Sequence, residues 1–297
     1  MDLRPFSRSD VEWAAALLAA RPTGHPLAAP VDAVAEISAL LDAGTSGRAA
    51  PGGYALGLVD GDAGWVRYAG HCAGDVATYR ALYAAVSRDF VAAGALRHAV
   101  EMPDADAVAG EAFANLAFGR EHVFALASLA SQPRAGADPR VRLADVGDFE
   151  TLRPLLPLLR RHLAEPPCWS PAPVVSEELW REDMENPATA YLVAEEGGEA
   201  VGFSTWEPLP PRVAVPDGAW ALGHMVLRAD ARGRGLGAAM TLAGLALGRE
   251  RGHTVSWTDW RLTNMTAEPY WRTYGWRPYL VRMTRRLEPG AAAAPVL

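Results

Sequence analysis

The amino-acid sequence predicts a mixed α/β fold built as two tandem domains of the same kind. At 297 residues the chain is about twice as long as a usual domain. Proline and glycine interrupt the hydrophobic pattern near the middle of the chain, and the segments on either side of that interruption resemble each other. In the second half, strand-like patterns alternate with helix-like patterns, which predicts helices packed on a mixed sheet.

The expected linker is the segment SLASQPRAGADPRVRLAD, which contains Pro133, Gly136 and Pro139. Just after it, VRLADVGDFE (141–150) aligns without a gap with LRPFSRSDVE (3–12), and an apolar helix follows each. The ends of the halves also correspond, because EAFANLAFGREHVFAL and EPYWRTYGWRPYLVRM each run from an aromatic helix through a turn into a strand. Two matches in the same order predict a duplication, with chance similarity as the alternative. The expected parts are domains at 1–134 and 140–288 and a disordered tail at 289–297.

The elements of the second half follow from periodicity and turn residues. A short strand at 140–143 precedes a helix over 146–164, which Pro154 and Pro157 interrupt, and a further short helix covers 176–184. The sequence EGGE joins the next two strands as a hairpin. The remaining expected elements are strands at 189–196, 200–207 and 219–228, a helix at 236–250, a strand at 254–260, a helix at 266–274 and a strand at 277–287.

The composition excludes several classes of function. All 28 positive side chains are arginines and 35 residues are acidic, which gives a net charge of -7. This balance argues against a nucleic-acid surface, which is usually basic. Without lysine the chain has neither a Schiff-base lysine nor a phosphate-loop lysine. The lysine-free composition, rich in alanine, arginine and glycine, indicates a bacterial protein from a GC-rich genome.

The two cysteines, Cys72 and Cys168, are far apart and have no neighbours at metal-ligand spacing. We therefore expect neither a metal site nor a disulfide, and the simplest compartment is a reducing cytoplasm. The N-terminal segment MDLRPFSRSDVEW has no apolar core of signal-peptide length, and no uncharged apolar run reaches about 18 residues. These features predict a protein that is neither secreted nor embedded in a membrane.

The stretch ARGRGLGAAM (231–240) follows a strand of buried type and opens a helix. The N–H groups of such a loop and first helical turn have no partner in the helix, so they bind anions, and glycine lets a phosphate come close. Arg232 and Arg234 add positive charge. Gly233, Gly235 and Gly237 alternate strictly, which does not fit the dinucleotide pattern G-x-G-x-x-G, and no G-K-[ST] follows.

The pattern R-x-x-G-x-G at Arg232, Gly235 and Gly237 resembles the pyrophosphate loop of the GNAT superfamily of N-acetyltransferases. A second GNAT pattern, an asparagine followed at fixed spacing by alanine, an aromatic residue and a glycine-aromatic pair, occurs at Asn264, Ala267, Trp271, Gly275 and Trp276. The resemblance covers roughly 140–288, as expected of one domain. The first half resembles the same fold in a degenerate form without R-x-x-G-x-G, so we expect it to be a structural partner that shapes the substrate cleft. Its corresponding residues are Asp106, Ala109, Phe113 and Phe118.

The resemblance implies how an acyl donor is held. Loop amides bind the pyrophosphate of acetyl-CoA, the pantetheine arm lies between splayed strands at 219–228 and 254–260, and a strand N–H, here that of Leu227, polarises the thioester carbonyl. The residues it implies for acetyl-CoA binding are Val226, Leu227, Arg232, Gly233, Arg234, Gly235, Leu236, Gly237, Ala238, Asn264 and Trp271. An amine then attacks directly in a ternary complex, without a metal.

The sequence departs from the family at the tyrosine that protonates the leaving thiolate. Trp271 stands in its place, and an indole N–H orients a sulfur but does not hand over a proton. Tyr270, Tyr274 or water is then left to supply that proton, or activity is lost.

Candidate bases lie on the neighbouring strands. His224 is able to accept the proton of an amine near neutral pH, but strand alternation places it with Val226 on the face opposite Leu227, which favours a packed, hydrogen-bonded histidine. Asp259 fits a base or a partner for a cationic amine, and equally a solvated acid at a strand end, and Glu207 has the same two interpretations. The catalytic candidates are His224, Asp259, Tyr270 and Trp271.

The loop AEPPCWSPAP lies where GNAT substrates enter, and tryptophans are frequent around it. They fit an aromatic wall for an amine, although packing explains most of them, and Cys168 in the loop fits an ordinary thiol better than a nucleophile. The tryptophans concerned are Trp169, Trp180, Trp206, Trp257 and Trp260.

The sequence thus predicts a tandem GNAT protein whose C-terminal copy transfers an acetyl group from acetyl-CoA to an amine, expected on a small molecule. The alternatives are a non-catalytic acyl-CoA-binding protein or sensor, and an enzyme that uses another acyl donor. No nucleic-acid or membrane partner is expected, and the chain is either a monomer or a homodimer.

Overall fold

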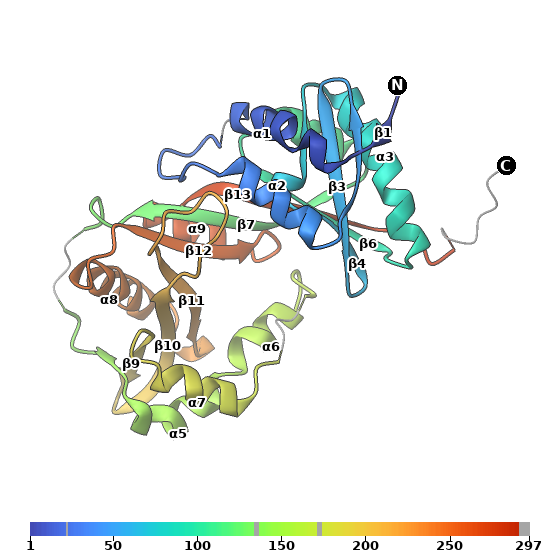
Figure 1. The fold of residues 1–297 in the computed structure, drawn as a ribbon. Helices are drawn as coiled ribbons and strands as arrows, with labels where there is room; N and C mark the ends of the chain where they lie inside the picture. Colours follow the sequence, from blue (N-terminus) through green and yellow to red (C-terminus); the bar gives the residue numbers. More distant parts are fainter. Residues whose placement is uncertain (22, 134–136, 171–173, 291–297) are drawn as a thin grey trace. The chain divides into compact units, whose positions relative to one another are not determined.

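The computed structural model describes residues 1–21, 23–133, 137–170 and 174–290 (Figure 1). The chain forms two compact units. The first contains Met1–Val123 and the chain from Pro278 onward, and the second contains Phe124–Arg277. The predicted domain limits concern the extent of the duplicated sequence and stay a prediction. The predicted tail lies outside the described residues from position 291 onward.

The second unit is a mixed sheet with helices on both faces. Neighbouring strands are antiparallel along the order β8-β9-β10-β11, and β12 runs parallel to β11. Its strands are β8 (Val141–Leu143), β9 (Ala190–Glu196), β10 (Glu199–Pro208), β11 (Trp220–Leu227) and β12 (Val255–Arg261). Its α-helices are α5 (Phe149–Leu152), α6 (Leu158–Ala164), α7 (Glu177–Glu185), α8 (Leu236–Glu250) and α9 (Ala267–Thr273). These agree with the predicted elements to within a few residues, and the helix expected at 146–164 is interrupted around Pro154 and Pro157, as predicted.

Alternating side chains of the sheet form two hydrophobic clusters. On one face, Val193, Phe203 and Val226 pack with residues of α5 and α7. On the other face, Ala194 and Val201 pack with the α8 side chains Leu236 and Met240. Successive strand residues point to opposite faces, so Val193 and Ala194 belong to different clusters.

The first unit repeats the same kinds of element. Its strands follow the order β1-β2-β3-β4-β6-β13, and β5 pairs with β3. These strands are β1 (Arg4–Pro5), β2 (Ser46–Ala50), β3 (Gly53–Asp60), β4 (Ala63–Val66), β5 (His71–Ala73), β6 (Arg97–Pro103) and β13 (Arg277–Arg286), and β7 (Gly119–Ser128) begins in this unit and ends in the second. Its α-helices are α1 (Val11–Ala20), α2 (Ala33–Asp42), α3 (Val76–Ala92) and α4 (Ala107–Ala114). The last strand, β13, pairs antiparallel with β6, for example Val281 with Met102.

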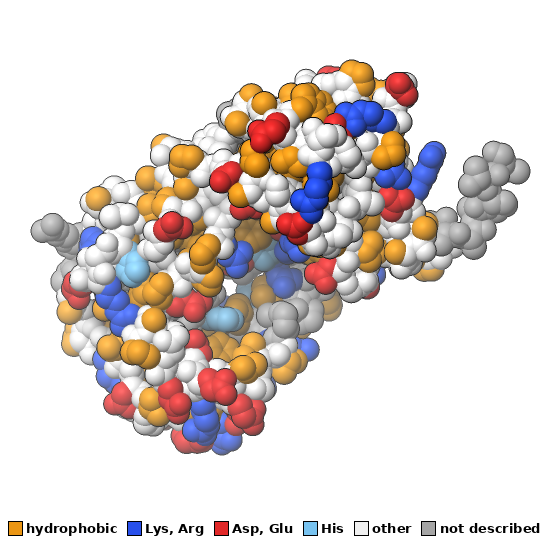
Figure 2. Space-filling model, in the orientation of Figure 1, with side chains coloured by type: hydrophobic (Ala, Val, Ile, Leu, Met, Phe, Trp, Pro, Cys, Tyr) orange, Lys and Arg blue, Asp and Glu red, His pale blue; other side chains and the backbone are white. Residues whose placement is uncertain are grey.

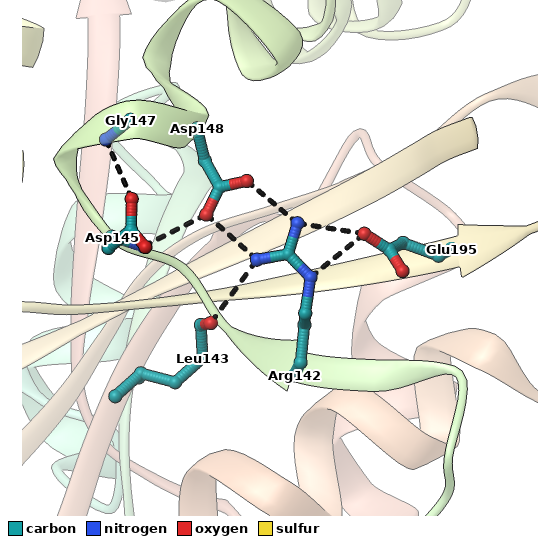
Figure 3. Close-up of polar contacts among 6 residues, drawn as sticks. All are labelled: Arg142, Leu143, Asp145, Gly147, Asp148 and Glu195. Atoms are coloured by element: carbon teal, nitrogen blue, oxygen red, sulfur yellow. Dashed lines mark hydrogen bonds and ion pairs between the residues drawn. The ribbon is translucent and has the colours of Figure 1, made fainter. Parts of the chain in front are cut away.

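The two aligned sequence segments have the same local structure. Each consists of a short strand, a 3-10 turn with a capping box, and a helix. In the second copy, Arg142 bonds both oxygens of Asp148 at 2.8 and 2.7 Å (Figure 3). In the first copy, Arg4 bonds both oxygens of Asp10 at 2.8 and 2.6 Å. These bonds lower the pKa of both carboxyl groups.

The ends of the two halves also share their packing. Phe113 and Phe118 meet edge to face with ring centroids 5.3 Å apart, and Trp271 and Trp276 meet in the same way at 5.5 Å. Before the second ring of each pair, the chain passes through the left-handed region, at Ala117 (φ 61°) and at Gly275 (φ 80°). Side-chain pairing and backbone conformation therefore repeat as the predicted duplication requires.

Ion pairs cover the surface of the second unit near α5 and α7. Figure 2 shows charged side chains of both signs gathered over these helices. Glu150 pairs with Arg153 and Arg181, and Arg153 also approaches Glu177.

Within the described residues, no helix has the length and apolar character needed to cross a membrane.

Candidate functional site

The strands β11 and β12 part shortly after they begin. Their parallel pairing consists of Trp220 with Ser256 and Ala221 with Trp257. One step further, Thr258 Oγ1 still donates to the carbonyl of Leu222 at 3.2 Å. Beyond this point the described residues show no further pairing of the two strands, and we call the gap between their backbones beside the C-terminal half of β11 the opening.

A β-bulge bends β11 at the start of this opening. Ser204 of β10 pairs with Met225, whereas Trp206 pairs with Leu222, so Thr205 faces the two residues Gly223 and His224. The hydroxyl oxygen of Thr205 accepts the N–H of His224 at 2.8 Å. A Cβ on Gly223 would lie only 2.9 Å from that oxygen, so the bulge needs glycine at this position.

The backbone of Leu227 faces the opening. The N–H of Arg228 donates to Val201 on β10 at 2.8 Å. Because backbone groups alternate in direction along a strand, the N–H and carbonyl of Leu227 point away from β10. The carbonyl accepts a bond from Arg232 Nε at 3.4 Å. The Leu227 N–H is therefore directed into the opening, and its role as a donor to the thioester stays a prediction.

The N-terminus of α8 lies next to the end of β11 and has no side-chain cap. Its N-cap residue is Gly235, in the left-handed region at φ 84°, and Gly233 before it has φ 76°. The first-turn N–H groups thus keep their capacity to bind an anion. In the first unit, the Asp75 carboxylate caps α3 and accepts the N–H of Thr78 at 2.8 Å. A carboxylate at that position repels a phosphate, so the two copies differ where the donor would bind.

Tyr270 belongs to α9, and its side chain reaches α8. Its hydroxyl group is hydrogen-bonded to Thr241 Oγ1 at 2.8 Å. A Cβ on Gly237 would lie 3.3 Å from the Tyr270 hydroxyl oxygen and 3.5 Å from Leu227 Cδ1, so this phenol is close both to the start of α8 and to the opening. Burial raises the pKa of Tyr270 above its usual value of 10, which keeps the phenol protonated at neutral pH.

Trp271 occupies a packing position. It is 9% exposed and contacts Trp276 as Phe113 contacts Phe118 in the first unit. By the same alignment, Tyr270 corresponds to Ala112. The aromatic ring at position 271 is therefore common to both copies, whereas the phenol at 270 belongs to the second copy alone.

His224 lies on the α7 side of the sheet. As predicted, its side chain is on the face opposite those of Met225 and Leu227. Its ring meets Trp180 edge to face at 5.1 Å, and Nδ1 is 3.5 Å from Thr205 Oγ1. Burial lowers its pKa below 6.5, while the charges of Asp259 and Asp183 act to raise it. His224 is therefore neutral at pH 7 and able to accept a proton.

Two acidic side chains, Asp183 and Asp259, lie near enough to this histidine to act on its charge, and a third, Glu207, lies near Asp183. Burial raises the pKa of Glu207, with a further contribution from the nearby Asp183. Asp183 also accepts the hydroxyl of Tyr191 at 2.5 Å. Because Asp183 and Asp259 both act on His224, the α7 side of the opening carries negative charge.

The remaining candidates include Asn264, two of the tryptophans and Cys168. Asn264 accepts a bond from Thr266 at 2.9 Å, and its Oδ1 lies 3.4 Å from His162 Nε2 of α6. Trp169 is 70% exposed at the end of the loop after α6, while Trp206 is buried in the core. Cys168 is a buried free thiol. Nothing in the spacing of the sequence indicated His162, and among the described residues no cluster of His, Cys, Asp or Glu could hold a metal ion.

One region of the chain matches a known protein family. Residues 156–276 match the model of the Acetyltransferase (GNAT) family. The matched segment contains the parted strands, the loop before α8, and α9. No curated protein matches the sequence.

Solved structures show the same fold over nearly the whole chain. A GCN5-related N-acetyltransferase from Sphaerobacter thermophilus superposes with a TM-score of 0.64 at 15% identity, covering 96% of this chain and 95% of the other. A tandem GNAT protein from the clavulanic acid biosynthesis pathway gives a TM-score of 0.51 at 16% identity, with coverage of 96% and 98%. At these identities the likeness establishes the fold, which confirms the predicted tandem GNAT architecture.

Proposed function

Since residues 156–276 form a domain of the GNAT acetyltransferase family, we propose that this chain transfers an acetyl group from acetyl-CoA to an amine of a small molecule. One observation carries the proposal. The uncapped N-terminus of α8, with Gly235 in the left-handed region, lies beside the opening between β11 and β12. An anion site and an extended opening in this order suit the diphosphate and the pantetheine arm of one ligand.

The residues present fit acetyl-CoA. The N–H groups of Leu236, Gly237 and Ala238 would bind the diphosphate, with Gly233 and Gly235 leaving space for it. The absence of a side chain on Gly237 keeps the approach to Leu227 and Tyr270 open. When bound, acetyl-CoA supplies an activated acetyl group as a thioester.

The residues along the opening would then perform two tasks. The N–H of Leu227 would donate to the thioester oxygen, on which negative charge develops during attack by the amine. The Tyr270 hydroxyl would donate its proton to the departing thiolate sulfur, and its bond to Thr241 fixes its position. Trp271 would support Tyr270, whose ring it contacts at a centroid distance of 4.7 Å.

The amine would approach from the α7 side of β11. Asp183, Glu207 and Asp259 would attract a cationic amine to this side. Neutral His224 would accept the proton that the amine must lose before or during attack. The exposed Trp169 offers an aromatic surface at the end of the loop after α6.

The pH dependence of the reaction tests the role of His224. Because burial lowers its pKa, the neutral form persists below pH 6.5, so we expect kcat/KM to stay level to that pH and to fall only in more acidic buffer. His224→Gln is expected to lower kcat about a hundredfold and to remove this acid limb. His253→Gln, in the same unit, serves as the control. An unchanged acid limb in His224→Gln would move the role of base to another group.

Binding and turnover together test the proposed function. Calorimetric titration is expected to show one CoA per chain, because the Asp75 carboxylate caps the corresponding helix N-terminus of the first unit and repels a phosphate there. Acetyl-CoA should then release free thiol in the presence of a suitable member of a panel of small amines. Binding without turnover over a broad panel would favour the acyl-CoA sensor, and the absence of CoA binding would refute the proposal. Two equivalents per chain would contradict the role given to Asp75.

We also place the protein in a reducing compartment such as the cytoplasm. Cys72 and Cys168 are free and buried. Burial raises the pKa of the Cys72 thiol, which disfavours the reactive thiolate.

A further inference from the structure

Arg140 contacts the loop before α8 although it lies far from that loop in the sequence. Its Nη1 donates to the carbonyl of Arg234 at 3.3 Å. Its Nη2 lies 3.9 Å from the position that a Cβ would take on Gly235. The backbone carbonyl of Arg140 accepts the N–H of Glu195 at 2.8 Å, which anchors the residue beside strand β9, just before the edge strand β8. A guanidinium group is thus fixed against the N-cap residue of α8.

The side chain of Arg140 retains hydrogen-bonding capacity. Asp138 accepts bonds from Nε at 3.0 Å and from Nη2 at 2.7 Å, which holds the guanidinium plane in one orientation. With the bond to Arg234, three of the five N–H groups of this guanidinium have partners within the described residues. One of the two remaining donors lies on Nη1 and the other on Nη2, the nitrogen near Gly235. The side chain is 40% exposed, so a ligand can reach it.

The other arginines of the loop are directed elsewhere. Arg234 pairs with Glu196, and Arg228 pairs with Asp230 at 2.6 Å and with Glu199 at 3.3 Å. Arg232 Nε bonds the carbonyl of Leu227. Among the described residues, Arg140 is therefore the arginine that brings a guanidinium nitrogen, Nη2, within 4 Å of the Cβ position of Gly235.

The duplicated copy provides an independent comparison. The gapless alignment that matches Arg142 with Arg4 also matches Arg140 with Asp2. The first copy has no glycine loop and carries Asp75 at the corresponding helix N-terminus. The copy whose helix N-terminus has no side-chain cap therefore has a positive residue, Arg140, at this position. The copy whose helix is capped by Asp75 has a negative one, Asp2.

We propose that Arg140 is a further donor-binding residue, which contacts the diphosphate of the acyl donor from its place just before strand β8. This inference rests on the proposed function, because it assumes that the diphosphate binds at the N-terminus of α8. Two planar N–H donors suit phosphate oxygens, and the ion pair with Asp138 orients them before the ligand arrives.

The test is the affinity of Arg140→Ala for ligands that differ in their phosphates. Titrations would use CoA, dephospho-CoA, which lacks the 3′-phosphate, and pantetheine, which lacks all phosphates and is followed by NMR. We expect CoA and dephospho-CoA to bind about five- to twentyfold more weakly than to the wild type, and pantetheine to bind equally well. A loss with CoA alone would overturn the assignment to the diphosphate, and so would an equal loss with pantetheine.

Two further variants separate charge from support of the loop. Arg140→Gln keeps an N–H donor at the position of Nε but reaches neither the Arg234 carbonyl nor a phosphate with a charged group, and we expect it to lose affinity as Arg140→Ala does. Wild-type affinity in Arg140→Gln would refute a contact with phosphate. Arg142→Ala is the matched control, because Arg142 has similar exposure, 42%, but binds Asp148 and Glu195 instead of the loop (Figure 3). It should leave all three affinities unchanged.

The outcome for the wild type separates this inference from the proposed function. If the wild type does not bind CoA, the proposed function fails and the inference with it. If the wild type binds CoA and Arg140→Ala binds it equally well, the inference alone is wrong.

Discussion

Gly235→Val is expected to weaken CoA binding about a hundredfold or more. Valine at the N-cap would force the backbone away from φ 84° and would place a branched side chain in the space of the diphosphate. The loss of two charge-assisted hydrogen bonds to the helix N-terminus accounts for this magnitude, because each contributes about 1.5–3 kcal/mol. The measurement is calorimetric titration with CoA.

The other end of the same helix offers a matched control. Gly252 has φ 86°, and a Cβ there would meet nothing within 4 Å. Gly252→Val therefore introduces similar backbone strain, about 1–2 kcal/mol, without approaching the ligand site. Both variants should unfold at a lower temperature than the wild type, but only Gly235→Val should lose CoA binding. Equal affinities in the two variants would show that the N-terminus of α8 does not hold the donor.

Tyr270→Phe is expected to lower kcat about a hundredfold and to leave the affinity for CoA within twofold of the wild type. Phenylalanine keeps the ring contacts with Trp271 and Tyr274 but has no proton to give to the thiolate. Because the raised pKa keeps the Tyr270 phenol protonated, the effect should be present throughout neutral pH. Thiol release from acetyl-CoA, with an amine identified from the panel, measures it.

Trp271→Phe is the corresponding control. It reproduces the aromatic residue of the first unit, Phe113, and so keeps an edge-to-face contact with Trp276. We expect a loss of stability of about 1–3 kcal/mol from the smaller ring and a change in kcat of less than about threefold. If Trp271→Phe removed activity and Tyr270→Phe did not, Trp271, at the position of the family's tyrosine, would be the residue that takes part in the reaction, although its indole gives up no proton.

The sequence was most informative where function depends on local backbone. The alternating glycines predicted an anion site at the start of a helix, and α8 begins at Leu236 with Gly235 in the left-handed region, as that requires. The predicted strands and helices also agree with the structure, because their hydrophobic periods reflect burial on two faces of a sheet. Two motifs far apart in the sequence occur in the order and at the spacing of the GNAT superfamily. This match predicted the tandem GNAT fold, which the solved structures confirm.

Features that depend on distant contacts were not evident in the sequence. Arg140 meets Arg234 through the folding of strand β9, and spacing alone does not reveal such a meeting. The sequence named Tyr270 among the candidate proton donors, but its nearness to Gly237 depends on how α9 packs against α8. The bulge opposite Thr205 is a register shift between two strands, which a pattern of alternating residues does not show. The roles of all these residues stay predictions until they are tested.

The pairing of β13 with β6 determines when the first unit can be completed during protein synthesis. Residues up to Val123 leave the ribosome early, but their partner strand follows only after the whole of the second unit. Until then the edge of β6 has unpaired backbone groups, which is a known hazard for aggregation in nascent chains. The second unit, by contrast, is one continuous segment of the chain. The first unit is therefore completed only after the whole of the second unit has been synthesised.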